Sequence, residues 1–222
     1  TGLVLALRDV VDRLDVKLGQ ISDKMALLAD AHAATLMAGR SQLQQAVPIT
    51  FGAKAVAWIG ALDRHRDRLG DLCPRLLVVQ FAGAVGTNAA VHPNGPTIRA
   101  HLAKALQLCD PTGSWHTARD GLAELVCCLG LIAWTLSKIA QDIALLAQTE
   151  VGVVKEPAIA GRGVSSTMPH KQNPVLSQQI IVAARAVRGL VPVMLEAMTQ
   201  DHERGTGVWP SEWALIPDAC SH

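Results

Sequence analysis

The stretch LAELVCCLGLIAWTLSKIAQDIALL, residues 122–146, decides the fold class. Its large apolar residues recur at alternating spacings of three and four, which places them along one face of a helix. This is a coiled-coil-like seam that continues for about four heptads. The seam consists of Leu122, Leu125, Leu129, Ile132, Leu136, Ile139, Ile143 and Leu146. Because one helix cannot bury so long a face alone, the stretch predicts a helical bundle.

Two other parts of the chain repeat this pattern. Residues 3–28 carry a stripe made of Leu3, Leu7, Val10, Leu14, Leu18, Ile21, Met25 and Leu28. Residues 175–198 carry Leu176, Ile180, Val187, Val191, Met194 and Met198, with Pro192 expected to kink the helix. Shorter helices are expected over residues 49–72, ending before Pro74, and over residues 97–108. We therefore predict an all-α fold, a long-helix bundle that assembles into a multi-subunit helical core.

Loops are expected where the helical pattern stops, at residues 38–50, 80–87 and 152–174. Only residues 76–81 carry a strand signal. The loop at 152–174 is long for a connection between two good helices, and such loops are often functional.

The composition excludes several classes of partner. The chain of 222 residues is 50% hydrophobic and 18% charged, against about 25% charged in average domains. With a net charge of +1 and 3% aromatic residues, we expect no nucleic-acid binding. No unbroken apolar run reaches the length of a membrane span, and no signal peptide is visible. The five cysteines show no metal-ligand spacing, so we expect no metal site and a reducing cytoplasm.

The stretch GRGVSSTMPHKQNP, residues 161–174, gathers chemically useful groups before a predicted helix. Asn173 suits a helix N-cap and Pro174 suits the first turn, so the positive end of the helix would face this loop. Lys171 and His170 add donors beside it, which predicts an anion site. From spacing alone, an ordinary surface loop with normal helix-start chemistry explains these residues equally well.

Residues 165–174, SSTMPHKQNP, resemble the signature loop of the fumarase/aspartase superfamily, Gly-Ser-Ser-x-Met-Pro-x-Lys-x-Asn-Pro. Residues 39–50, GRSQLQQAVPIT, resemble its second block, and residues 83–87 and 148–152 match other family segments. The resemblance covers essentially the whole chain but only half of a usual member. It implies that residues 1–222 are the central helical-bundle domain, with the N-terminal and C-terminal family domains absent.

Three more segments resemble one branch of this superfamily, the 3-carboxy-cis,cis-muconate cycloisomerases of protocatechuate catabolism. They are WHTARD at 115–120, HERG at 202–205 and EWALIP at 212–217. The resemblance implies a cofactor-free cycloisomerase that interconverts a small polycarboxylate, 3-carboxy-cis,cis-muconate, and its lactone. It also implies a homotetramer with active sites shared between subunits.

The resemblance assigns roles to individual residues. Ser165, the first serine of the signature, is the expected general base, and Lys171 and Asn173 are expected to bind substrate carboxylates. Arg204 is expected to bind a third carboxylate, although an exposed salt bridge is an equal alternative. Further substrate contacts are expected from Ser166, Ser41, Gln42, Gln44, His116 and Thr117. Ordering of the loop is the alternative role for Ser41 and Gln44, and capping a helix is the alternative for Thr117.

Gln42 stands where most superfamily members carry a histidine acid. A leaving group as basic as hydroxide needs that acid, whereas a lactone opens to a carboxylate with a pKa of about 4 and leaves unaided. Gln42 therefore favours lactonization over fumarase or adenylosuccinate lyase chemistry. The alternative is a degenerate active site.

Two departures from the signature bear on the substrate. Val164 replaces a glycine, and Gln172 replaces an arginine common in the lactonizing branch. Either change could shift the substrate toward a sulfonated muconate. Another superfamily lyase, such as adenylosuccinate lyase, and a non-catalytic helical oligomer core remain the competing functions.

Overall fold

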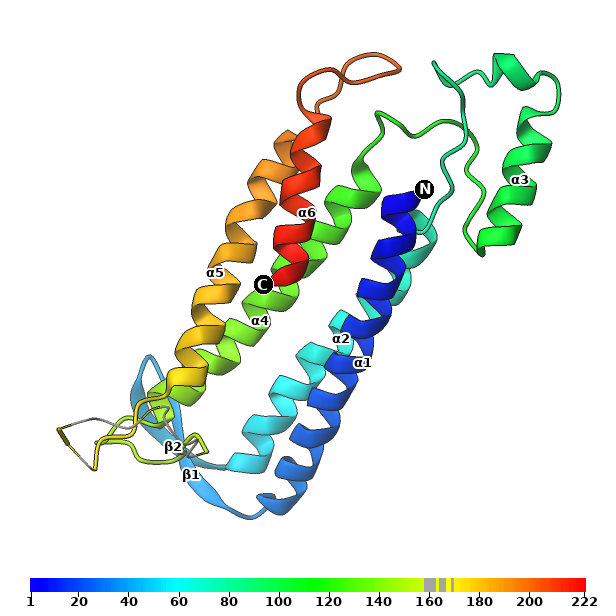
Figure 1. Ribbon diagram of the computed structural model, residues 1–222. Coiled ribbons are helices and arrows are strands. Elements are labelled where there is room, and N and C mark those ends of the chain that lie inside the picture. The colour runs from blue at the N-terminus through cyan, green and yellow to red at the C-terminus, as the bar shows by residue number, and fades with distance from the viewer. Residues whose placement is uncertain (158–162, 164–166, 169) are drawn as a thin grey trace. The chain divides into compact units, whose positions relative to one another are not determined.

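The seam at residues 122–146 forms helix α4 (Asp120–Leu146) of an all-α, long-helix fold (Figure 1). The other long helices are α1 (Gly2–Ala31), α2 (Phe51–Leu76) and α5 (Val175–Glu196). Short helices are α3 (Gly95–Leu106) and α6 (Glu212–Ser221), with single turns η1 (Ala89–Val91) and η2 (Trp209–Ser211). The computed structural model describes residues 1–157, 163, 167–168 and 170–222.

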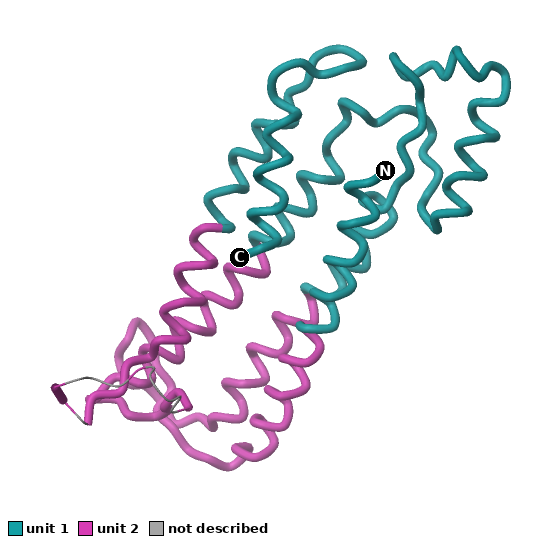
Figure 2. The backbone as a smooth tube through the Cα atoms, in the orientation of Figure 1, with its two compact units in different colours: residues 1–17, 65–130, 187–222 teal, residues 18–64, 131–186 magenta. Residues whose placement is uncertain are grey.

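The chain divides into two compact units (Figure 2). Unit 1 comprises residues 1–17, 65–130 and 187–222, and unit 2 comprises residues 18–64 and 131–186. Each long helix is divided between the two units, with one part of its length in unit 1 and the other part in unit 2.

The predicted ends of α2 are wrong, and the strand signal at residues 76–81 corresponds only to an isolated β-bridge. The helix continues through Pro74 to Leu76. Leu72 and Leu76 are almost fully buried, and their burial outweighs the one backbone hydrogen bond that Pro74 cannot donate. After the helix only Val78 forms an isolated bridge, to Cys109.

Residues 38–50 form a β-hairpin rather than the expected loop. Strand β1 (Leu36–Ser41) pairs antiparallel with β2 (Gln44–Thr50), and the register shifts between Ala38 and Arg40. Gln42 and Leu43 make the turn with φ values of 50° and 66°. Two-residue hairpin turns need positive φ and usually contain asparagine or glycine, so this turn carries no sequence signal.

In unit 1, a small core stands between the start of α1 and the segments around α3. Val4, Val79, Ala103 and Leu108 are its buried members. Trp115 packs against them and donates from its indole nitrogen to the carbonyl oxygen of Val79 at 2.9 Å. This contact fixes the start of the segment that carries His116 and Thr117.

In unit 2, the core consists of buried aliphatic residues, and a few polar side chains near it bind one another. Leu18, Ala55, Leu62 and Ile139 are at most 4% exposed. The indole nitrogen of Trp58 donates to the Oδ2 atom of Asp142 at 3.1 Å, and the ammonium of Lys54 lies 3.1 Å from the same oxygen.

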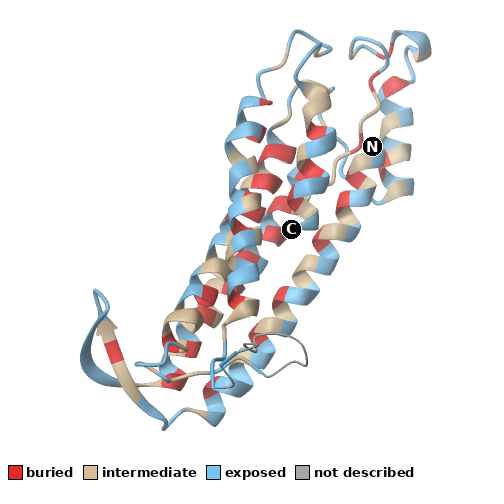
Figure 3. Cartoon of the chain, turned by 60° about the vertical axis from the view of Figure 1, so that its left-hand side comes forward, coloured by how far each residue is buried: buried red, intermediate tan, exposed pale blue. Residues whose placement is uncertain are grey.

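By length and composition, α4 and α5 are apolar enough to cross a membrane, although no unbroken apolar run in the sequence reaches the length of a span. The apolar window of α4 is 56% buried inside the protein, as in the core helix of a soluble protein. The window of α5 is only 17% buried, and Figure 3 shows exposed positions beside buried ones along the helices. Large apolar residues are exposed on both: Leu131, Trp134, Ile180, Val182, Val193 and Leu195.

Candidate active site

The predicted site residues fall into two sets, one in each unit. In unit 2, Ser41, Gln42 and Gln44 lie exposed at the tip of the hairpin. Lys171 and Asn173 line a pocket before α5, also in unit 2. Arg204, His116 and Thr117 gather in unit 1. The expected base, Ser165, and its neighbour Ser166 lie outside the described residues.

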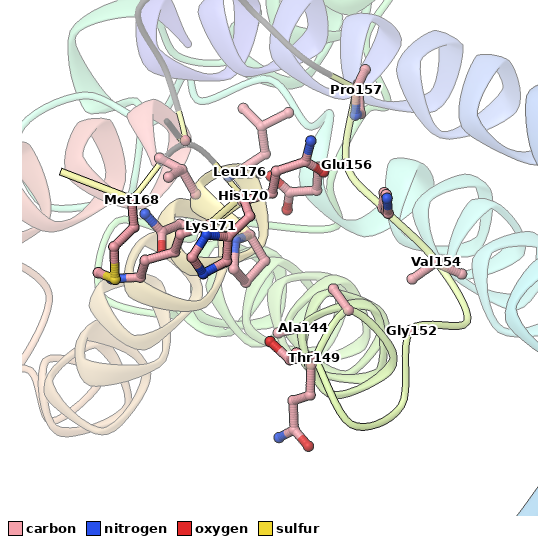
Figure 4. Close-up of a pocket in the computed structure, with 18 residues that line it drawn as sticks. Ala144, Thr149, Gly152, Val154, Glu156, Pro157, Met168, His170, Lys171 and Leu176 are labelled. Carbon is pink, nitrogen blue, oxygen red and sulfur yellow. Dashed lines mark hydrogen bonds between the residues drawn. The ribbon is translucent and has the colours of Figure 1, made fainter. Parts of the chain in front are cut away.

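The pocket in unit 2 has a volume of about 910 Å³ and lies between the end of α4 and the start of α5 (Figure 4). Figure 4 shows Met168, His170 and Lys171 grouped on one side, with Val154 and Pro157 across from them. Its other lining residues include polar groups suited to a carboxylated ligand, namely Gln148, Thr149, Gln172 and Asn173. The pocket therefore combines two lysine cations, Lys155 and Lys171, with amide and hydroxyl donors.

Glu156 occupies the N-terminal end of α5. Its Oε2 atom accepts the N–H of Leu176 at 2.9 Å, and its Oε1 atom accepts the N–H of Ser177 at 2.8 Å and the Ser177 hydroxyl at 2.7 Å. The prediction that Asn173 caps this helix is therefore wrong, because a carboxylate from the preceding segment does so. The expected anion site at the helix end is already filled by the chain itself.

Burial raises the pKa of the Glu156 carboxyl, but the hydrogen bonds from Ser177 and Leu176 together outweigh burial, and the pKa lies below its usual value. The lowered pKa favours the ionised carboxylate, which acts as the counter-charge of the helix end. Sequence analysis missed it because the acceptor lies 20 positions before the helix N–H groups it meets. Lys171 lines this pocket together with Lys155, so two lysine side chains are placed there as cations for a substrate.

Arg204 is the centre of the second set. Its Nε atom donates to the carbonyl oxygen of Ala84 at 2.5 Å, and one terminal nitrogen donates to the carbonyl oxygen of Gly83. The other terminal nitrogen lies 2.8 Å from Nδ1 of His116. Within the described part of the chain, the structure does not show Arg204 in the alternative role of an exposed salt bridge. Its guanidinium nitrogens instead contact two backbone carbonyl oxygens and an imidazole.

The segment with His116 and Thr117 is fixed from several sides. The hydroxyl of Thr117 donates to the carbonyl oxygen of His202 at 2.9 Å, so it joins two loops rather than capping a helix. The ring of His116 packs edge-on against Trp209, with 5.6 Å between centroids. A nitrogen of Arg119 donates to the carbonyl oxygen of His116 at 3.3 Å.

Arg119 and Glu212 form a buried ion pair behind this set, which sequence analysis missed. The Nε atom of Arg119 donates to Oε1 of Glu212 at 2.8 Å, and a second nitrogen donates to Oε2. The side chains are 10% and 1% exposed. The pair joins the residue before α4 to the first residue of α6.

Burial lowers the pKa of the His116 imidazole, and the positive charges of Arg204 and Arg119 lower it further. Glu212 acts in the opposite direction and more weakly. His116 is therefore neutral at physiological pH. Among the residues that the structure describes, no cluster of three or more His, Cys, Asp or Glu side chains is placed to hold a metal.

Comparison with known proteins places the chain in one family. Residues 1–189 match the family model described as "Lyase". Over 220 residues the chain is 49% identical to the 3-carboxy-cis,cis-muconate cycloisomerase of Pseudomonas aeruginosa, covering 99% of this chain and 48% of that relative. It is 42% identical over 217 residues to trans-aconitate decarboxylase 1 of Mycosarcoma maydis, covering 98% of this chain and 44% of that relative.

A solved structure gives the same result for the fold. The crystal structure of the 3-carboxy-cis,cis-muconate lactonizing enzyme from Pseudomonas putida matches with a TM-score of 0.93 and 48% identity, over 99% of this chain and 49% of that chain. The chain thus spans about half the length of the relatives it matches.

Proposed function

The chain belongs to the lyase family within the fumarase/aspartase superfamily, and we propose that it is the central helical-bundle domain of a 3-carboxy-cis,cis-muconate cycloisomerase. The observation that carries the proposal is the likeness to the Pseudomonas cycloisomerases, at 48–49% identity over 99% of the chain. Such enzymes would interconvert 3-carboxy-cis,cis-muconate and a carboxymuconolactone without a cofactor.

In the lactonizing direction a substrate carboxylate oxygen attacks the neighbouring double bond. A carbon–oxygen bond forms, and the electron pair of the double bond moves toward a second carboxylate to give an aci-carboxylate. Ser165 then delivers its hydroxyl proton to carbon. In reverse, the serine alkoxide removes that proton and the lactone oxygen leaves as a carboxylate, with Gln42 at the position where an acid is not required.

The extra charge of the intermediate needs fixed cations and donors. We assign Lys171, Asn173, Ser166, Ser41, Gln42 and Gln44 to this task in unit 2, and Arg204, His116 and Thr117 in unit 1. From the resemblance to the fumarase/aspartase superfamily, the proposal also includes a homotetramer in which different subunits complete one site. The exposed apolar residues of α4 and α5 support such an assembly. All five cysteines are free, which supports a reducing cytoplasm.

The test is a direct assay of the complete protein, meaning residues 1–222 with any flanking sequence that the gene encodes. We expect the ultraviolet absorbance of 3-carboxymuconate to fall, and replacement of Ser165 by alanine to reduce kcat about 10²–10⁴-fold. We expect residues 1–222 alone to be weakly active or inactive. Conversion of adenylosuccinate or trans-aconitate in place of 3-carboxymuconate would overturn the proposal.

A further inference from the structure

The contact between Arg204 and His116 fixes where the imidazole carries its proton. A guanidinium has only N–H donors and no acceptor. The 2.8 Å contact with Nδ1 of His116 therefore requires a lone pair on Nδ1. In a neutral ring the single proton then sits on Nε2, and a doubly protonated ring would point an N–H at the guanidinium.

The guanidinium is itself held so that it cannot turn away. Two of its nitrogens donate to the consecutive carbonyl oxygens of Gly83 and Ala84, and those bonds set the plane in which the third nitrogen meets His116. Gly83 has a φ of 73°, a conformation that favours glycine, which gives the carbonyl pair its direction. Trp209 packs against the ring of His116 from η2.

We propose that Arg204 is a positioning residue that holds His116 as the neutral imidazole with its proton on Nε2, so that His116 offers an uncharged donor to a substrate carboxylate. The identity of that acceptor rests on the proposed function, whereas the position of the proton does not. A neutral imidazole binds its remaining proton far more tightly than an imidazolium does. It can donate a hydrogen bond and still leave the attacking carboxylate ionised and nucleophilic.

The charges around the ring favour the same state. Arg204 faces His116 from the loop before η2, and Arg119 faces it from the end of its own segment. Glu212 at the start of α6 is the opposing charge, and both its oxygens are bound by Arg119. Burial and the two arginines lower the pKa of His116.

The test is nuclear magnetic resonance of protein with ¹⁵N-labelled histidine rings, with the His116 signals assigned by their loss in His116→Gln. We expect a proton on Nε2 and an unprotonated Nδ1 at neutral pH. In Arg204→Met we expect the titration midpoint of His116 to move upward. Arg13→Met, which changes an exposed arginine of α1 in the same unit, should leave that midpoint unchanged.

Circular dichroism establishes that each variant is folded. If Arg204→Met does not fold, Arg204→Gln replaces it, because a glutamine removes the charge but keeps an amide that can donate to a backbone carbonyl. A proton on Nδ1 in the parent, or an unchanged midpoint in a folded Arg204 variant, would overturn the inference. In the complete protein, the acid limb of the kcat profile should also move to higher pH in the variant. If the proton is on Nε2 but 3-carboxymuconate is not converted, only the proposed function fails.

Discussion

Arg119 and Glu212 illustrate how strongly burial determines the contribution of an ion pair to the free energy of unfolding. Their side chains are 10% and 1% exposed, and two hydrogen bonds join them. Arg75 and Glu124 form a pair with similar connectivity in the same unit, but they are 53% and 43% exposed. Water and salt screen the exposed pair, whereas removal of one partner from the buried pair leaves an uncompensated charge.

We therefore expect Glu212→Gln to lower the free energy of unfolding by about 3–5 kcal/mol, because the guanidinium of Arg119 stays buried without its counter-charge. Glu124→Gln is the matched control and should cost about 1 kcal/mol or less. Urea unfolding followed by circular dichroism measures both. Equal losses in the two variants would contradict this account of the buried pair.

At the scale of the element, the start of α5 depends on a residue that is not part of the helix. Glu156 binds the N–H groups of Leu176 and Ser177 that no earlier helical carbonyl can accept. A carboxylate there also opposes the positive end of the helix. The position of Lys171 and Asn173 before α5 thus depends on a contact formed across the intervening segment.

Replacement of Glu156 by alanine should lower the free energy of unfolding by about 1–2 kcal/mol, as for loss of other N-caps. The folded-state pKa of Glu156 is below its ordinary value. Its contribution is therefore complete above the unfolded-state pKa and is lost as pH falls through the folded-state pKa. Unfolding measured against pH should show the parent converging on Glu156→Gln under acid conditions. Glu150→Ala, at an exposed glutamate just after α4, is the control and should change little.

At the scale of the whole molecule, a single chain leaves many large apolar side chains exposed to solvent. Leu131 is 50% exposed, Trp134 54%, Ile180 42% and Val182 65%, all on α4 and α5 within unit 2. Soluble monomers rarely expose so many large apolar residues along neighbouring stretches of helix. The long apolar seams in the sequence predict the same, because one chain does not supply enough helices to cover all of these faces.

Light scattering coupled to size exclusion tests this directly. We expect a multimer for the parent and, for Val182→Lys, a dissociation constant at least about tenfold higher, since a charge would be placed in an apolar interface. Thr112→Lys, in an exposed loop of unit 1, should not alter the mass. A monomeric parent would contradict the proposed assembly.

The sequence predicts most of the helices because their apolar periodicity is strong, as in α1, α4 and α5. It fails at the hairpin, where Gln42 and Leu43 adopt left-handed backbone without the usual turn residues. It fails again at Pro74, where tertiary burial of Leu76 overrides a helix-breaking residue. Lys171 and Arg204 are predicted as candidate site residues through the family resemblance. Glu156 and Glu212 are not, because their partners lie far away in the chain.

The contact of Glu156 with Ser177 also has an entropic consequence. It brings together two positions that are 21 residues apart and so closes the chain between them. The entropy of closing such a loop changes slowly with its size, and doubling the number of residues costs only about 0.6 kcal/mol. A change in the number of residues between these two positions is therefore expected to alter the stability of the helix that follows only slightly.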